Sequence, residues 1–177
     1  MTTQRTQADL NTLFADNDTR LITPARLRDF VESCVPSAAM LHLAAAATVV
    51  AVAGTFTKAL NTSTLDGTAK RFSSAVDNRI TYDGPADTLV HLSATIALKA
   101  AADDQVVAVG FAKNGVLVAE SVVRVKLPLG ANLTPIALLA MLELEATDYV
   151  EVFITNDTTA SNVTIDHGHV HAIAFLT

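Results

Sequence analysis

The feature that most constrains the fold of this chain is an alternation of apolar and polar side chains with period two. In residues 89–98 every second position carries a core-type side chain: Val90, Leu92, Ala94, Ile96 and Leu98. Successive side chains of a strand point to opposite faces, so this pattern predicts a strand with one buried face. Similar runs, separated by turn residues, follow at 106–112, 116–126, 136–145, 149–155 and 162–176. Strands at this spacing predict a mainly β chain that folds as an antiparallel sandwich or barrel.

One hairpin can be placed from its turn. Asn114-Gly115 stands between the runs at 106–112 and 116–126. Both residues tolerate the positive φ that a two-residue primed turn requires. We therefore expect these two runs to be antiparallel neighbours.

The composition indicates a surface that is partly covered. Only 17% of the 177 residues are charged and the mean hydropathy is +0.37, whereas about a quarter of the residues are charged in a typical soluble domain. We expect such a chain to bury surface against copies of itself or a larger assembly. The net charge of −6 leaves no basic excess, so neither nucleic acid nor an anionic membrane is an expected partner. The one cysteine, Cys34, cannot form an intrachain disulfide.

The first 36 residues follow a helical period instead. Thr6 and Asp9 resemble a capping box, which predicts a first helix with three apolar positions at helical spacing: Leu10, Leu13 and Phe14. Thr23 can cap a second helix, Pro24 suits its first position, and Pro36 ends it. The apolar stripe of this second helix is Leu27, Phe30, Val31 and Cys34.

Two such short helices cannot fully bury these stripes against each other, so they dock either on another protein or on the chain's own β domain. The apolar run at 40–53 follows them, and Val49-Val50-Ala51-Val52 favours a strand. We predict the first strand at 47–58. The chain then divides into a helical anchor segment (1–36), a connector (37–46) and a β-sandwich domain (47–177).

Four stretches of the β region together resemble a known family in their order and spacing: Val52–Lys58, Arg79–Gly84, Val107–Gly115 and Ala146–Ile165. They resemble a jelly-roll domain of phage and prophage proteins, which is similar in shape to the tumour-necrosis-factor and complement globular heads. Those heads are ten-stranded sandwiches that trimerise. The resemblance spans roughly residues 47–175, and Phe14–Val35 resembles the short segment that precedes such domains in tailed-phage virion proteins.

The resemblance implies an antiparallel jelly-roll sandwich that forms a non-enzymatic homotrimer in a tailed-bacteriophage virion. We expect a capsid decoration or cement protein on the capsid surface, because a tail fibre normally needs a shaft and the chain has no repeat or coiled-coil run. The expected partner is the major capsid protein or another virion protein. The residues expected to anchor the chain there are Leu10, Leu13, Phe14, Leu27, Phe30 and Val31.

The alternative is a receptor- or glycan-binding tail fibre or tail-tip protein. Its host surface receptor would contact three loops rich in Asn, Asp and Thr, at 61–66, 83–87 and 156–161. Such residues suit sugar hydroxyls, but they equally suit turns.

The sharpest chemical feature is the group of His167, His169 and His171. On an unbroken strand they share one face, and near a threefold axis they could form rings of imidazoles that bind a metal ion or an anion. The same face would carry residues that look like core: Val163, Ile165, Ile173 and Phe175. Gly168 is moreover a plausible bulge, which would turn the later side chains to the other face. We therefore expect packed or edge histidines, with no metal site and no cofactor.

No set of residues typical of catalysis stands out. Glu143 and Glu145 alternate with leucines, and with Glu151 they are expected to be solvated carboxylates. His42 and His91 stand alone, and His91 is expected at the surface. The sequence has no Gly-rich phosphate loop, zincin motif or nucleophile elbow. We expect a protein without enzymatic activity.

Overall fold

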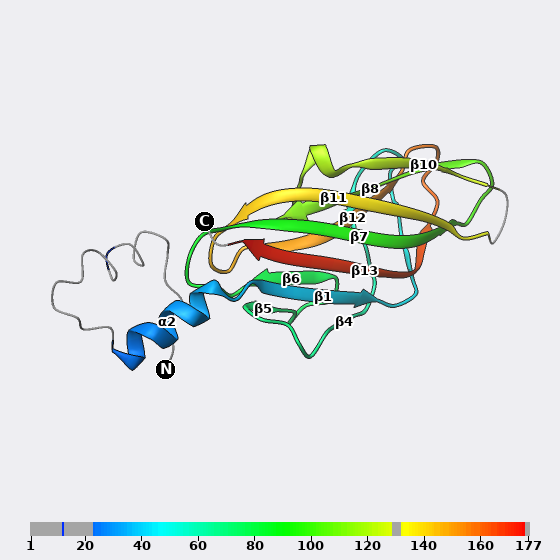
Figure 1. Ribbon diagram of the computed structural model, residues 1–177. Coiled ribbons are helices and arrows are strands. Elements are labelled where there is room, and N and C mark those ends of the chain that lie inside the picture. Colours follow the sequence, from blue (N-terminus) through cyan, green and yellow to red (C-terminus); the bar gives the residue numbers. More distant parts are fainter. Residues whose placement is uncertain (1–11, 13–22, 129–131, 176–177) are drawn as a thin grey trace.

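The chain folds into a sandwich of two antiparallel sheets, with helix α2 (Pro24–Cys34) extending from one end (Figure 1). The computed structural model describes Thr12 and residues 23–128 and 132–175. Helix α2 begins as predicted, because the Thr23 side chain accepts a hydrogen bond from the Arg26 amide at 3.3 Å and Pro24 stands in the first turn. The helix predicted after Thr6 lies outside the described residues, except for Thr12.

We name the two sheets after their central strands. The β7 sheet has the order β11 (Thr134–Leu144), β7 (Thr88–Ala100), β13 (Val163–Phe175), β1 (Ser37–Leu43) and β4 (Ser63–Leu65), with β2 (Ala46–Thr48) paired to β13. The β8 sheet has the order β10 (Val123–Leu127), β8 (Gln105–Lys113), β12 (Tyr149–Asn156), β6 (Arg79–Tyr82) and β5 (Phe72–Ser73). In the same sheet β3 (Thr57–Lys58) pairs with β12 and β9 (Val116–Leu117) pairs with β8.

The connectivity is that of a jelly roll. Strands β1 and β13, far apart in sequence, lie side by side. The chain passes between the two sheets from β6 to β7 to β8, and again from β10 through β11 and β12 to β13. Consecutive long strands therefore face each other across the core, as in a double-sheet jelly roll. The predicted mainly β, antiparallel jelly-roll sandwich is confirmed.

The core lies between the sheets and is filled by alternate residues. On β7 the five predicted inward positions are at most 3% exposed: Val90, Leu92, Ala94, Ile96 and Leu98. Tyr82 is fully buried and donates its hydroxyl to the Ala86 carbonyl at 2.9 Å, and burial raises the pKa of this hydroxyl. The Tyr82 ring explains why residue 84 is a glycine, because a Cβ at that position would lie 2.0 Å from the Tyr82 hydroxyl oxygen.

The predicted hairpin turn is confirmed, since φ is 52° at Asn114 and 79° at Gly115, between β8 and β9. The return strand predicted at 116–126 is interrupted by a 3₁₀ turn (Ala119–Ser121). There the Ser121 hydroxyl accepts a hydrogen bond from the Phe111 amide at 2.8 Å, so the interruption satisfies a backbone group of β8.

The sandwich begins earlier in the chain than the predicted residue 47. Residues 37–43 of the expected connector form β1, which pairs with β13 and β4 and buries Ala39, Leu41 and Leu43. The single strand predicted at 47–58 is wrong: its ends belong to β2 and β3, and residues 49–56 form the loop between them, with Val49 and Val52 about 60% exposed. The alternation at 37–43 is a correct strand pattern, but the larger hydrophobicity of 49–52 obscures it.

Candidate functional site

The outer face of the β7 sheet is almost without formal charge. Strands β11, β7, β13 and β1 contain only three charged residues, Glu143 at one end and Lys99 with Asp166 at the other. Between them, uncharged side chains form three cross-strand rows: Met141–His91–Ile173–Ala38, Leu139–Ser93–His171–Met40 and Ala137–Thr95–His169–His42. We call the outward residues of these four strands the histidine face, because all five histidines of the chain lie on it.

A β-bulge between Ile165 and His167 creates this face. Before the bulge Val163 and Ile165 point into the core and are fully buried; after it the three histidines of β13 point outward. The expected bulge at Gly168 is therefore wrong. Gly168 faces inward, where a Cβ would lie 3.2 Å from Ile96 Cγ1.

The residues that looked like core beside the histidines divide at the same bulge. Ile173 is 39% exposed and Phe175 is 50% exposed, so the expectation that they belong to the core is wrong. They join Leu139 and Met141, which are 64% and 54% exposed, on the outer surface. Exposed apolar side chains gathered on one face are typical of an interaction site.

Two histidines meet on this face. His42 and His169 are directly opposite each other on β1 and β13, with ring centroids 4.7 Å apart in an edge-to-face arrangement. Burial, and then the neighbouring His42, His171 and His167, lower the pKa of His169 below its usual value. The low pKa favours the uncharged imidazole of His169.

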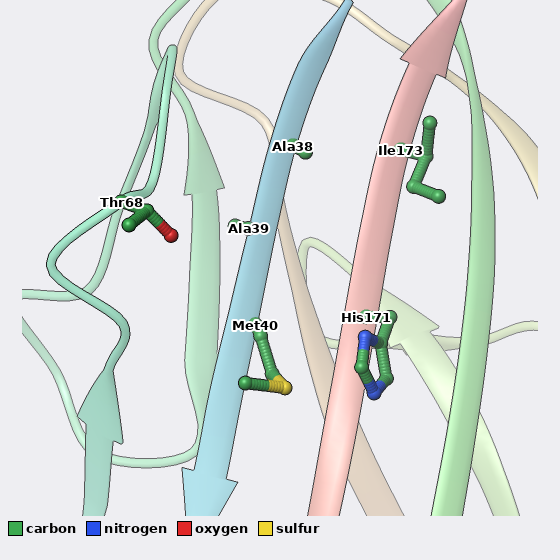
Figure 2. A pocket seen from close by; sticks show the side chains of 6 residues that line it. All are labelled: Ala38, Ala39, Met40, Thr68, His171 and Ile173. Carbon is green, nitrogen blue, oxygen red and sulfur yellow. The ribbon is translucent and has the colours of Figure 1, made fainter.

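The face has a shallow hollow between β1, β13 and the turn at Thr68 (Figure 2). Figure 2 shows Met40 and His171 on adjacent strands, with Ala38 and Ile173 further along the same strands. Ala38 and Ile173 at the upper end and Met40 at the lower end supply apolar surface to this hollow, beside His171.

The outer face of the β8 sheet is organised by ion pairs instead. Glu151 on β12 lies 2.7 Å from Lys58 Nζ and 2.9 Å from Arg79 Nη2, and the Arg79 guanidinium also stacks on Tyr149 at 3.7 Å from the ring centroid. Because Glu151 is only 4% exposed, the prediction that it is a solvated carboxylate is wrong. Its opposite neighbours on β6 and β3 are cations, but sequence alone does not reveal which strands pair.

Further ion pairs follow along this face. Arg124 meets Asp157, Lys126 meets Asp104, and Lys113 meets Asp148 at 2.8 Å. Partial burial would raise the pKa of Asp148, but hydrogen bonds from Lys113, Asn114 and the Glu145 amide outweigh it and lower the pKa to about 2. This surface has its charges matched within the chain.

Helix α2 presents part of the predicted anchor. Leu27, Phe30 and Val31 are 52%, 39% and 55% exposed on it, while Leu10, Leu13 and Phe14 lie outside the described residues. Cys34, expected to behave as a small hydrophobe in this stripe, is exposed. In Figure 1 the helix projects away from the sandwich rather than lying on either sheet.

The C-terminal end of α2 is fixed to the sandwich by one arginine. Arg71 donates to the carbonyl oxygens of Glu32 at 2.8 Å and Val35 at 3.3 Å, and to the Ser37 hydroxyl at 3.1 Å. These are carbonyls that a helix end leaves without intrahelical partners, so a cation there stabilises the end. Hydrogen bonding from Lys70 lowers the pKa of the Glu32 carboxyl, which keeps it paired with both cations.

The three loops considered for sugar binding do not form one surface. The loop at 83–87 precedes β7 at the end of the sandwich that carries α2, whereas 156–161 connects β12 to β13 at the opposite end (Figure 1). Asn61 and Asn156 are buried, and each donates its side-chain amide to another part of the chain: Asn61 to the Ala44 carbonyl, and Asn156 to Gln105 and Ser161. The Asn156 oxygen also accepts from the Thr158 amide, so this side chain holds its own turn.

Glu143 and Glu145 are exposed, as predicted, and His91 is half-buried on the histidine face. Within residues 23–128 and 132–175, together with Thr12, no three His, Cys, Asp or Glu side chains converge on a point that would hold a metal ion. In the same part of the chain no helix has the length and apolarity needed to span a membrane.

Comparison with known proteins gives a likeness of fold. No protein-family model matches the chain and no curated protein matches it. Among solved structures it is similar to murine APRIL at 12% identity and a TM-score of 0.49, covering 78% of this chain and 99% of that chain. Rabbit GITRL matches at 9% identity and a TM-score of 0.44 (78% and 95% covered), and pika GITRL at 10% and 0.43 (79% and 95%). These are jelly-roll ligands of the tumour-necrosis-factor superfamily. The jelly-roll fold of this chain is established by its own strand order and pairing.

Proposed function

We propose that this chain is a non-enzymatic structural protein of a tailed-bacteriophage virion, a capsid decoration protein that assembles as a homotrimer through its histidine face. One observation supports assembly through this face. The outer face of the β8 sheet has its charges paired within the chain, whereas the histidine face has no charge to pair over three consecutive rows of side chains.

This charge distribution favours another copy of the chain as the partner. A face without formal charge can meet a copy of itself without bringing like charges together and without stripping water from unpaired ions. Leu139, Met141, Ile173 and Phe175 supply apolar surface whose burial stabilises the contact at about 25 cal/mol per Å². The trimer, rather than a dimer, is what the resemblance to phage jelly rolls implies.

Helix α2 supports the second part of the proposal. It stands away from the sandwich on a rigid attachment through Arg71, and its stripe of Leu27, Phe30 and Val31 is exposed. An amphipathic helix held in this way suits an apolar groove on a partner, for which we propose the major capsid protein. The alternative, receptor binding through the loops, has no comparable support, because Asn61 and Asn156 are turned inward.

Light scattering on a sizing column tests the assembly. We expect a mass of about 56 kDa, three times the chain mass of 18.6 kDa. A monomer at micromolar concentration would contradict the homotrimer.

Binding to capsids of the encoding phage, purified from a strain that lacks this gene, tests the anchor. The double variant Leu27→Glu/Val31→Glu should bind at least about tenfold more weakly, because it places two carboxylates in the apolar contact. Ala25→Glu adds one such carboxylate on the opposite side of the same helix and should bind normally. Equal binding by all three proteins would remove α2 from the anchor, and absence of the protein from purified virions would overturn the virion assignment.

A further inference from the structure

The five histidines of this chain lie together on a surface that has few other titratable groups. They belong to β1, β7 and β13, which are neighbours in one sheet, and three of them occupy outward positions of β13. Imidazole is the side chain whose charge ordinarily changes between about pH 5 and pH 8. Mild acid therefore converts the histidine face from uncharged to positive, while carboxylates, lysines and arginines keep their charges.

The charged residues of these strands, of β11 and of the turn beside β1 stand at the rim of the histidine face: Glu143, Lys99, Asp166, Asp66 and Lys70. Lys99 is paired with Asp166 at 3.0 Å, and Lys70 with Glu32 at 2.9 Å. Asp166 also lies 3.2 Å from His167, between Oδ2 and Nδ1. Within the part of the chain that the structure describes, the other four histidines have no carboxylate at ion-pairing distance. A proton on any of those four is an unmatched charge.

Two of the four also face each other. His42 and His169 are directly opposed on β1 and β13, with ring centroids 4.7 Å apart. Their neighbours on the strands to either side are hydroxyl side chains, Thr64 opposite His42 on β4 and Thr95 opposite His169 on β7. Two imidazolium rings at this distance repel each other, and a hydroxyl group does not neutralise either one. Full protonation of this pair is therefore costly already in the single chain.

Covering the face increases that cost. An imidazolium ion in water is hydrated, whereas one enclosed between two uncharged faces loses its hydration and gains no anion. A second copy of the chain brings the same histidines to the contact, so it adds positive charge rather than a carboxylate. Protons thus bind more tightly to separated chains than to assembled ones, and by linkage acid favours separation.

We propose that the histidine face is a pH-dependent contact, which holds copies of this chain together while its imidazoles are neutral and releases them when His42 and His169 take up protons. The inference rests on the homotrimer proposed above, in which this face is covered. Overall charge predicts the opposite response, because protons on the histidines offset most of the net charge of −6 and so reduce the repulsion between whole chains. The direction of the change therefore separates the local contact from the overall charge.

The experiment uses the full chain without an affinity tag. Light scattering follows the mass through a dilution series at pH 8.0 and at pH 5.5, and circular dichroism follows the strand content at both. We expect the concentration at which half of the trimer has dissociated to be at least about tenfold higher at pH 5.5, with unchanged strand content. Returning the sample to pH 8.0 should restore the mass of about 56 kDa, three times 18.6 kDa.

Two variants assign the effect to the histidine pair. The double variant His42→Gln/His169→Gln keeps a polar side chain at both positions without a titratable group, and it should reduce the acid effect at least about fivefold. The matched control is His167→Gln, which removes a histidine of the same strand that has its own carboxylate, and the acid effect should stay within about twofold of the wild type. All three positions point outward, so equal thermal unfolding of the proteins at pH 8.0 checks their fold.

The outcomes distinguish this inference from the proposed function. A 56 kDa species with the same dissociation at both pH values, or a tighter one at pH 5.5, overturns the pH-dependent contact and leaves the homotrimer intact. Separation that occurs only with loss of strand content also contradicts it, because the contact must release folded chains. Equal acid effects in the double variant and in His167→Gln overturn the assignment to His42 and His169. A mass of 18.6 kDa at both pH values overturns the homotrimer and this inference together.

Discussion

The two sheets of this sandwich have the same inner chemistry and opposite outer chemistry. Inside, both supply Val, Leu, Ile and Ala to one core. Outside, the β8 sheet carries Lys58, Arg79 and Glu151 in one cluster and further ion pairs beside it. The outer side of the β7 sheet carries five histidines and exposed Leu, Met, Ile and Phe instead.

This difference between the outer faces affects association with other molecules rather than folding of the sandwich. Alternation of side chains needs only that every second residue be apolar, so either kind of outward residue allows the sandwich to close. What the outward residues decide is whether a face is more stable in water or against another surface. Paired charges on a surface stay well hydrated and contribute little when they are covered. Covering an uncharged face with large apolar groups lowers the free energy, because those groups are removed from water.

The largest predicted effect comes from breaking the contrast with one charge on the histidine face. Leu139→Asp places a carboxylate at a position that is 64% exposed in the monomer. If three copies cover this face, each buries an unpaired charge, at a cost of several kcal/mol. We expect at least about a 100-fold weaker assembly and a mass that falls to that of one chain, measured by light scattering across a dilution series.

The matched control is Val116→Asp on β9. Val116 is 71% exposed and belongs to the β8 sheet, so the same charge there should leave the mass unchanged. Identical masses for the two variants would place the contact somewhere other than the histidine face. Neither side chain is in the core, so the monomer of each variant should unfold at the same temperature as the wild-type monomer.

The second effect tests the ion pairs of the other sheet. Glu151→Gln leaves Lys58 and Arg79 facing a neutral amide at a buried position. Loss of a buried partner costs about 3–5 kcal/mol, and since both cations are partly exposed we expect the lower end, about 3 kcal/mol in urea unfolding. Glu143→Gln removes an exposed carboxylate from the β7 sheet and should change stability by less than about 0.5 kcal/mol. Similar losses in the two variants would contradict the contrast between the faces.

Much of the fold could be predicted because its long strands alternate regularly. Val90 to Leu98 predict the inward side of β7 correctly, and Asn114-Gly115 predicts the β8–β9 turn. The prediction failed where local hydrophobicity competes with alternation. The strong apolar run at 49–52 belongs to a loop, while the weaker alternation of Ala39, Leu41 and Leu43 belongs to β1.

The candidate site was harder to predict because it depends on pairing between distant segments. The histidines of β13 were visible, but their orientation depends on a bulge at Asp166, for which the sequence offers no marker as clear as a glycine. That His42 meets His169 follows only from the pairing of strands 127 positions apart in the chain. The same holds for Glu151, whose cations lie on β3 and β6. Alternation shows which side chains share a side of one strand, but not which strands are neighbours.

The smallest predicted effect is a change of stability with pH that comes from one ion-paired carboxylate of the β8 sheet, Asp148. The pKa of Asp148 is about 2 in the folded chain and 3.8 when unfolded, so its charged form stabilises the fold above about pH 4. As the pH falls from 4 to 2 this contribution, about 2 kcal/mol, is lost. Asp148→Asn lacks the charge at every pH, and should be less stable than the wild-type chain by about that amount at pH 6 and equal to it near pH 2. Urea unfolding of both proteins across this range measures the difference, in which all other titrating groups cancel. A difference that stays constant down to pH 2 would mean that Asp148 contributes through its shape and hydrogen bonds alone, and that charge matching on the β8 sheet adds no stability of its own.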